Sequence, residues 1–275
     1  MNPKQNRKIF LYVFLIVLAA VWLLPAIFMI FTAVKSPQDL FSKKLFTLPD
    51  HIVWQNFIDA WNQGKMGMYM KNSLIIAILK VPLGIFIEAM AAFALTRLNL
   101  KRGTALFLFF FIGMMVPIQV TLVPLNIMLS KVGLINNYLG LFIIYIGFGI
   151  PFGILVLRGF FRTIPKEIDE AAQLDGCNSF KLFLNIILPI ARPAIATLLI
   201  LDFLSTWNEF LLASVFLTSD EMRTIPVGLL RFQGEFSINY PLLNAGVLIS
   251  VLPALTVYLL FQRYFVEGLS GSVKG

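Results

Sequence analysis

Long apolar segments alternate with shorter polar ones along the whole chain. At about 20 residues or more, each apolar segment can cross a hydrocarbon core of about 30 Å as a helix. The segments are continuously apolar and do not alternate with a period of two, so helices are predicted and barrel strands are not. We therefore expect an all-α integral membrane protein with six transmembrane helices. The segments occupy residues 9–34, 73–95, 104–129, 138–160, 184–215 and 242–264.

The first apolar segment begins like a secretion signal, because Lys4, Arg7 and Lys8 precede it. Its apolar run of about 26 residues is much longer than a signal-peptide core of about 7–15 residues. No convincing cleavage site ends the run. We expect this segment to be retained as the first transmembrane helix.

The composition agrees with lipid as the solvent of most of the surface. Apolar residues make up 59% of the 275 residues and charged residues 13%, whereas soluble domains carry about 25% charged residues. The mean hydropathy is +0.85. The net charge of +8 comes mainly from basic residues between apolar segments, without interleaved aromatic residues. Membrane lipid is therefore an expected partner and nucleic acid is not.

The scarcity of cysteine and histidine limits the chemistry of the chain. Cys177 is the single cysteine and His51 the single histidine. One cysteine excludes an intrachain disulfide, and no spacing typical of metal ligands is present. We expect neither a metal site nor a catalytic centre.

Lysine and arginine residues predict the orientation of the chain. With the N-terminus inside, the inner segments hold twelve of these residues and the outer segments hold eight. The contrast is clearer in the short connections: Arg97, Lys101 and Arg102 crowd one of them, and Lys131 stands alone in the next. Because positive residues favour the cytoplasmic side, both termini are expected in the cytoplasm.

Three connections are long enough to carry more than a turn. The chain is expected to form one domain over residues 1–275, with outer loops at about 35–72 and 216–241 and an inner connection at about 158–183. Trp54 and Trp61 in the first outer loop suit interfacial anchoring. The outer loops have two open interpretations, namely solvated connections or a docking surface for an outside partner.

The inner connection is itself helical by pattern. Thr163 can cap a helix and Pro165 suits its first turn. Gly176 is a natural stop for the same helix. Three acidic residues place negative charge at the N-terminal end of this helix, where the helix dipole is positive: Glu167, Asp169 and Glu170.

The predicted inner helix offers a surface that another protein can grasp. Small Ala171 and Ala172 permit close approach, and Glu170 offers a charge to an arginine. Ile168 and Leu174 extend the apolar side. The alternative is an amphipathic helix on the inner membrane face, but its acidity argues against this because anionic lipid attracts basic faces.

The same connection carries a family resemblance. Glu170-Ala171-Ala172, Gly176, Ile186 and Leu188-Pro189 resemble, in every fixed position, the signature of the membrane subunits of binding-protein-dependent ABC importers. Over nearly its whole length the chain is similar to the maltose-type second permease subunit of the carbohydrate branch. The further matching stretches are 207–210, 225–229, 245–246, 262–269 and 273–275.

The resemblance implies partners and roles. The inner connection would form a coupling helix that docks in a cleft of a cytoplasmic ATPase subunit, and the outer loop 216–241 would face an extracytoplasmic solute-binding protein. A second permease subunit and an ATPase dimer would complete a complex in the bacterial plasma membrane. The implied ATPase-docking residues are Glu170, Ala171, Ala172, Leu174 and Gly176. The C-terminal tail, including Gly268, Lys274 and Gly275, would reach the interface between the two ATPase subunits.

Polar residues inside the apolar segments need a reason, because they are costly in lipid. Asp202 and Glu209 are seven positions apart, about 20° from one helix face, with Thr206 between them. Gln119 and Asn126 have the same spacing in the third segment. We predict that these five residues face a translocation path. Hydrogen bonding between helices, or a place near the interface, is the alternative.

Two further intramembrane features are predicted to be structural. Lys80 and Glu88 are eight positions apart, about 80° round a helix, so direct pairing is not expected and Glu88 needs another partner or water. Gly149 and Gly153 flank Pro151, which favours close packing against a neighbouring helix and a kink. For the predicted translocation path, the resemblance implies few substrate contacts on this chain, because in the maltose-type pair these contacts fall mainly on the other subunit.

The chain lacks the familiar nucleotide-binding loop. Gly-x-x-x-x-Gly-Lys-Ser/Thr does not occur, so ATP and its hydrolysis are expected from partner subunits, and no cofactor is expected. The leading hypothesis is a permease subunit of an ATP-driven carbohydrate importer. Open alternatives are an ABC importer permease for another solute, such as glycerol phosphate, and a self-sufficient secondary transporter, for which no clear internal repeat is seen. A membrane enzyme is least favoured, because no nucleophile–base pair appears.

Overall fold

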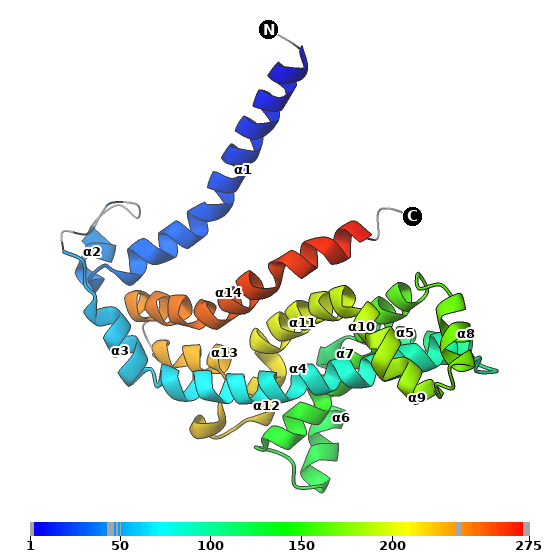
Figure 1. Ribbon diagram of the computed structural model, residues 1–275. Helices are drawn as coiled ribbons and strands as arrows, with labels where there is room; N and C mark the ends of the chain where they lie inside the picture. The colour runs from blue at the N-terminus through cyan, green and yellow to red at the C-terminus, as the bar shows by residue number, and fades with distance from the viewer. Residues whose placement is uncertain (1–2, 43–46, 48, 50, 235–237, 272–275) are drawn as a thin grey trace. The chain divides into compact units, whose positions relative to one another are not determined.

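Helices form nearly all the regular structure of the protein (Figure 1). The computed structural model describes residues 3–42, 47, 49, 51–234 and 238–271. Over these residues the β-pairing is confined to one isolated bridge between Gln233 and Ile238. The predicted all-α class is confirmed. The chain divides into two compact units, one of residues 1–67 with 228–252 and one of residues 68–227 with 253–275.

Two sets of close contacts occur within the first unit. Asn56 Nδ2 donates hydrogen bonds of 2.8 and 2.9 Å to the carbonyls of Ala33 and Lys35, which holds α3 against the end of α1. A Cβ atom at Gly246 would lie 2.7 Å from the ring of Phe232, so glycine permits that close contact. The helices are α1 (Pro3–Ala33), α2 (Pro37–Ser42), α3 (Gln55–Gln63), η3 (Leu229–Phe232) and the start of α14 (Tyr240–Gly271).

The second unit contains most of the remaining helices. They are α4 (Met66–Arg97), α5 (Gly103–Gly113), α6 (Ile118–Lys131), α7 (Tyr138–Phe161), α8 (Glu167–Leu174), α9 (Ser179–Leu182), η1 (Phe183–Ile187), α10 (Leu188–Ile190), α11 (Arg192–Trp207), α12 (Leu211–Phe216), η2 (Asp220–Met222) and α13 (Ile225–Gly228). Helices α4 and α13 each begin or end at the limit between the two units, and the end of α14 belongs to the second unit.

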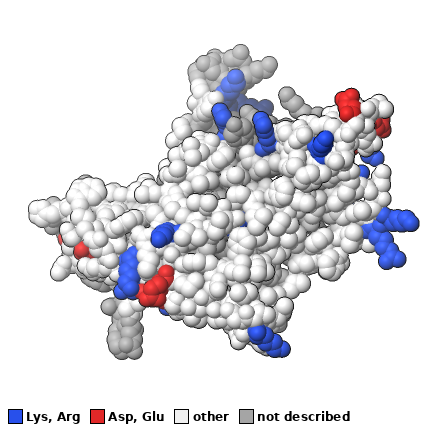
Figure 2. Space-filling view, turned by 60° about the horizontal axis from the view of Figure 1, so that its bottom comes forward, with Lys and Arg blue, Asp and Glu red and all other residues white. Residues whose placement is uncertain are grey.

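Helices α4, α6, α7 and α12 share one apolar core in the second unit. Leu141, Ala213 and Phe216 are almost completely buried in it. Outside the core, large apolar side chains remain exposed, including Phe109 at 71% and Val123 at 69%. Figure 2 shows a surface on which charged side chains form small separate groups among uncharged residues. Such a surface suits contact with lipid or with partner helices.

Four helices are long and apolar enough to cross a membrane. They cover Arg7–Ala33, Met66–Arg97, Tyr138–Phe161 and Tyr240–Arg263. Two more candidate spans are bent pairs of helices, α5 with α6 at 96° and Ser179–Ile190 with α11 at 78°. The described residues therefore contain six spans if each bent pair crosses once.

The expectation of one continuous helix over residues 104–129 was wrong. Helix α5 ends at Gly113, and α6 begins only after Pro117, whose φ of −62° and ψ of 130° are those of extended chain. Proline has no backbone N–H and disfavours the helical conformation of the residue before it. Pro117 therefore separates two helices within one apolar segment.

The expectation of one helix over residues 184–215 was also wrong. The chain bends at Ala191, with Pro189 and Pro193 on either side. Helix α11 then ends at Trp207, and α12 begins at Leu211. An apolar run satisfies the length rule for a span whether or not its backbone is broken, so hydropathy alone does not reveal these breaks.

Candidate functional site

The inner helix expected from the sequence is α8, and it starts later than predicted. Lys166 precedes it, without a side-chain cap. Thr163, the expected cap, instead donates from Oγ1 to the carbonyl of Phe160 at 2.8 Å. Ile164 precedes Pro165, and a residue before proline disfavours the helical conformation. The helix therefore begins after Pro165, and the predicted cap was wrong.

The end of α8 is the one expected from Gly176. This glycine has a φ of +80°, which residues with a Cβ atom rarely adopt. Its N–H donates to the carbonyl of Gln173 at 3.0 Å, and the N–H of Cys177 donates to that of Ala172 at 2.9 Å. These bonds satisfy carbonyl groups that the end of the helix would otherwise leave unpaired.

The faces of α8 differ from the predicted apolar side. Ala172 and Asp169 are buried, whereas Glu170 and Ala171 are exposed. Leu174 is 90% exposed, the highest exposure of any large apolar residue described. Positions three or four apart share a helix face, so Ala171 and Leu174 lie outward while Ala172 packs inward. The outward surface thus contains Glu170, Ala171, Leu174 and Gly176 without Ala172.

Arg97 fastens α8 and the chain before it to the end of α4. Its Nη1 lies 2.9 Å from Oδ2 of Asp169, and these side chains are 4% and 13% exposed. Its Nη2 donates to the carbonyls of Phe161 and Ile164, each at 2.8 Å. Figure 1 shows α8 beside the C-terminal end of α4. From the sequence, Arg97 was used only to predict the orientation of the chain, and this role was not predicted.

Half of the predicted tail, residues 272–275, lies outside the described residues. Gly268 belongs to α14, which ends at Gly271. Lys274 and Gly275 lie outside the described residues. The role of the tail stays a prediction.

A cavity of about 410 Å³ lies among α4, α6, α7, α11 and α12. Three of the five predicted path residues, Asp202, Thr206 and Glu209, line it together. The other two, Gln119 and Asn126, are exposed on α6 and do not belong to this lining. The polar residues of the lining are Lys80, Glu88, Tyr145, Asp202, Ser205, Thr206 and Glu209.

Lys80 and Asp202 form a buried ion pair in the wall of this cavity. This pair was not predicted, because the spacing within one helix compares Lys80 only with Glu88. Glu88 is 1% exposed. Its Oε2 and the Oδ2 of Asp202 are buried without a hydrogen-bond partner among the described residues. Besides Glu209, the cavity wall thus holds two carboxyl groups near a single lysine, and Asp202 is the one paired with it.

Gly149 and Gly153 make room for the carboxyl group of Glu88. A Cβ atom at Gly153 would overlap this carboxyl group, and one at Gly149 would lie 3.1 Å from Glu88 Oε1 and 3.3 Å from Lys80 Nζ. The close packing predicted for this glycine pair therefore occurs against side chains of α4. The two glycines admit a polar group into the contact between α7 and α4.

Glu209 connects the broken fifth segment to α7. Its Oε2 accepts a hydrogen bond of 2.5 Å from the Tyr145 hydroxyl. Its carboxylate also accepts the N–H groups of Leu212 at 2.7 Å and Ala213 at 3.0 Å, which satisfies the start of α12. Glu209 therefore lines the cavity and also makes the interhelical hydrogen bond that the sequence analysis gave as an alternative.

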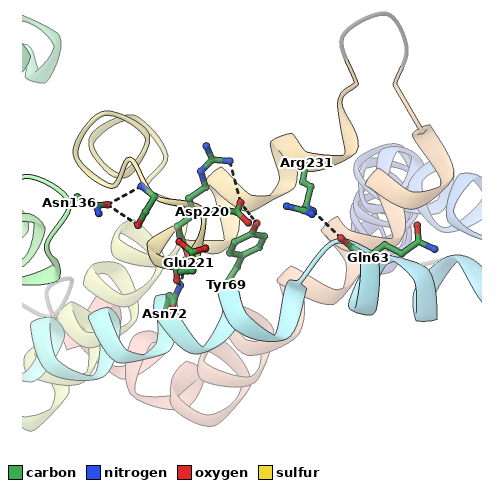
Figure 3. A network of polar contacts seen from close by, with 9 residues as sticks. Gln63, Tyr69, Asn72, Asn136, Asp220, Glu221 and Arg231 are labelled. Carbon is green, nitrogen blue, oxygen red and sulfur yellow. Dashed lines mark hydrogen bonds and ion pairs between the residues drawn. The ribbon is translucent and has the colours of Figure 1, made fainter.

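Part of the loop that the sequence predicts to be an outer loop, residues 216–241, contacts the start of α4 (Figure 3). Asn72 Nδ2 donates to the carbonyls of Glu221 at 2.8 Å and Arg223 at 2.9 Å. The hydroxyl of Tyr69 donates to Oδ1 of Asp220 at 2.7 Å. Both side chains stand on α4 and point toward the turn that contains Asp220 and Glu221.

Two further contacts hold the same stretch of loop. Ser73 Oγ accepts the N–H of Ile225 at 2.8 Å. Asn136 Oδ1 accepts the N–H and the hydroxyl of Ser219 at 2.9 and 3.1 Å. In the first unit, Figure 3 also shows Arg231 Nε donating to the carbonyl of Gln63, at 2.9 Å. Residues 219–225 therefore have defined contacts to α4 and to the connection before α7.

Known proteins match this chain over nearly its whole length. Residues 80–270 match the family described as binding-protein-dependent transport system inner membrane component. The chain is 40% identical over 269 residues to the probable ABC transporter permease protein YurM of Bacillus subtilis (strain 168), covering 97% of this chain and 87% of that one. It is 33% identical over 261 residues to the melibiose/raffinose/stachyose import permease protein MelC of the same organism, covering 94% of each.

A solved structure shares the fold. It is the crystal structure of a bacterial ABC transporter involved in the import of the acidic polysaccharide alginate, with a TM-score of 0.83. The match covers 96% of this chain and 98% of the other at 22% identity. At this identity the similarity concerns the fold.

Proposed function

The chain belongs to the family of binding-protein-dependent transport system inner membrane components, and we propose that it is a permease subunit of an ATP-driven carbohydrate importer. The relative named for import of melibiose, raffinose and stachyose supports the carbohydrate class. The subunit forms half of a translocation path in the bacterial plasma membrane, with both termini in the cytoplasm. A second permease subunit forms the other half. ATP is bound and hydrolysed by a cytoplasmic ATPase dimer.

The observation that carries this proposal is the outward surface of α8. Leu174 is 90% exposed beside the exposed Glu170 and Ala171. A large apolar side chain in this position, next to an acidic one, suits a cleft of a partner protein better than water or an anionic membrane surface. We assign α8 as the coupling helix, with Glu170 paired to an arginine of the ATPase subunit.

The contacts of Arg97 supply a route from the coupling helix into the membrane. When the ATPase dimer closes and moves α8, Asp169 moves with it, and Arg97 passes the displacement to the end of α4. Helix α4 carries Lys80 and Glu88, which line the cavity. A shift of α4 therefore changes the cavity wall, as alternation between inward-open and outward-open states requires.

The cavity is the part of the path that this subunit contributes. The carboxyl groups of Asp202 and Glu209 and the hydroxyl of Thr206 are hydrogen-bonding groups for the hydroxyl groups of a sugar. Aromatic Tyr145, Phe148 and Phe152 supply apolar surface beside them. We assign Gln119 and Asn126, exposed on α6, to the face toward the second permease subunit.

The outer loop is the docking site for the solute-binding protein in this proposal. Residues 219–225 are bonded to Tyr69, Asn72 and Ser73 of α4. Contact with the binding protein can thus bias the same helix that Arg97 joins to α8. One end of α4 is then linked to the solute-binding protein, and the other end is linked through α8 to the ATPase.

Reconstitution of the assembled complex tests the proposal. Proteoliposomes with both permease subunits, the ATPase and the binding protein should take up a neutral oligosaccharide only when ATP is supplied. The present chain alone should not accumulate it. Gradient-driven uptake by the chain alone would support a secondary transporter, and preferred uptake of glycerol phosphate by the complex would overturn the carbohydrate assignment.

A further inference from the structure

Three helix ends meet around a basic pocket in the second unit. The pocket has a volume of about 450 Å³ and lies between the α4–α5 turn and the end of α7. Among the described residues that line it there is no aspartate or glutamate. Its four cationic side chains are Lys101, Arg102, Arg158 and Arg162. Like charges repel one another, so such convergence favours an anion between them.

Arg158 is the deepest of the four. The residue is 8% exposed, and its Nε is buried without a hydrogen-bond partner among the described residues. The centre of its guanidinium lies 3.8 Å from the ring centroid of Phe107, which holds it in place by a cation–π contact. Burial of an unsatisfied donor on a charged group is costly. An anion in the pocket would supply the missing acceptor.

The start of α5 adds backbone donors to the same pocket. Helix α5 has 11 residues, no side-chain cap and no acidic residue in its first turn. Thr104 and Ala105 line the pocket, and they precede the first i→i−4 bond of the helix, from Leu106 N–H to the carbonyl of Arg102 at 3.0 Å. A helix start with free N–H groups and no carboxylate is a favourable place for a phosphate.

The position of the pocket identifies the source of that phosphate. Three membrane-crossing or apolar segments end at it: α4 at Arg97, α5 at Gly103 and α7 at Phe161. The ends of transmembrane helices lie at the depth of lipid headgroups, where basic pockets between helices bind anionic lipids. We propose that this pocket binds the phosphate of an anionic phospholipid headgroup, in addition to the function proposed above.

The arrangement differs from the general excess of positive charge on a cytoplasmic loop. Exposed cations attract an anionic surface without a defined site. Here Arg158 is buried and fixed against Phe107, and the backbone of α5 contributes from a third direction. These groups surround the pocket from different directions and favour one position for the phosphate.

Lipid binding by the purified full chain in nanodiscs tests this site. The probes are phosphatidylglycerol and phosphatidylcholine, with retention of bound lipid measured by native mass spectrometry. The wild-type chain should retain phosphatidylglycerol preferentially. The exposed double variant Lys101→Gln/Arg102→Gln should bind phosphatidylglycerol about tenfold more weakly or worse. Lys131→Gln, which removes an exposed cation elsewhere, should bind it as the wild type does.

Further measurements separate the outcomes. Arg158→Gln should abolish the preference, and Arg158→Lys should restore part of it, because an ammonium supplies charge without the fork of donors. Equal phosphatidylglycerol binding by the wild type and the double variant would overturn the site. Inorganic phosphate is the competing probe. If it displaces phosphatidylglycerol from the wild-type chain and is itself retained equally well, the lipid assignment is overturned in favour of soluble phosphate.

Discussion

Arg97 Nη1, at the end of α4, lies 2.9 Å from Asp169 Oδ2 in α8. The same guanidinium donates to the carbonyl groups of Phe161, the last residue of α7, and of Ile164, in the turn before α8. Arginine suits this place because its planar fork of donors binds several acceptors at once. The contact joins a short helix with an exposed outer surface to a long helix that lines the cavity. Its consequences can be measured on the chain alone and in the assembled complex.

Replacement of Arg97 should loosen α8. In Arg97→Gln the buried carboxylate of Asp169 loses its cation, and breaking such a pair costs about 3 kcal/mol. A nitroxide on Cys177, the single cysteine, should become more mobile, and stimulation of ATP hydrolysis by the loaded binding protein should fall about fivefold or more.

Controls distinguish this effect from general misfolding. Lys166→Gln, which removes an exposed cation in the same connection, should leave label mobility unchanged. The exchange Arg97→Asp/Asp169→Arg should recover part of the loss. Unchanged mobility and stimulation in Arg97→Gln would show that the contact does not hold α8.

Leu174 should matter for docking and hardly for folding. Because it is 90% exposed, Leu174→Ala should change the free energy of unfolding by less than about 0.5 kcal/mol. Affinity of the permease pair for the ATPase, measured by co-purification or light scattering, should nevertheless fall. Glu170→Ala should act in the same direction.

Gly176 provides a contrasting variant. At a φ of +80°, Gly176→Ala should lower the free energy of unfolding of the helix end by about 1 kcal/mol and weaken docking by misplacing α8. Normal ATPase binding and normal coupling in Leu174→Ala, Glu170→Ala and Gly176→Ala together would refute the docking assignment.

Removing one partner of the buried ion pair between Lys80 and Asp202 should destabilise the protein, because the other charge is left buried without its counter-charge. Lys80→Met leaves Asp202 buried without its cation, and Asp202→Leu does the same to Lys80, so each should lower thermal stability by about 3 kcal/mol. The double variant should be destabilised by less than the sum of the two single effects. Additive losses in the thermal unfolding of the purified chain would mean that the two charges do not interact.

Gly153 should not tolerate even one methyl group. In Gly153→Ala the new Cβ overlaps the carboxyl group of Glu88, and overpacking of this kind costs about 1–3 kcal/mol. The matched control is Gly147→Ala on the same helix, where nothing lies within 4 Å of the added atom. That variant should be as stable as the wild type or slightly more stable.

A second substitution tests the cause. Combining Gly153→Ala with Glu88→Ala should recover most of the stability lost by Gly153→Ala, because the overlapping group is removed. Thermal unfolding of the four proteins is the measurement. Failure of Glu88→Ala to rescue Gly153→Ala would place the origin of the effect elsewhere.

The features predictable from the sequence were those that depend on local pattern. Apolar length predicted the six candidate membrane segments, and the end of α8 at Gly176 followed from the place of this glycine after a helical pattern. The meeting of Asp202 and Glu209 at one cavity was predicted from helical spacing. The structure brings them together although α11 ends at Trp207, between the two residues.

The features that escaped prediction depend on distant parts of the chain. Lys80 and Asp202 are 122 positions apart, and no periodicity in either segment reveals the other. Arg97 resembled an ordinary positive residue of a short connection until the fold brought Asp169 to it. The inward position of Ala172 depends on what packs beneath α8, which the helix pattern alone does not specify.

Tyr69 and Arg97 stand near the two ends of α4, and the rise of a helix places them about 42 Å apart. Pro82 lies close to the midpoint between them, where the helix lacks one backbone hydrogen bond. The helix is therefore weakest close to its midpoint, at Pro82. A tilt of about 3° about that point would displace each end by about 1 Å, comparable with the tolerance of a hydrogen bond. The stiffness of the helix at Pro82 would then determine whether a displacement of one end of α4 also moves the other end or only bends the helix at the proline.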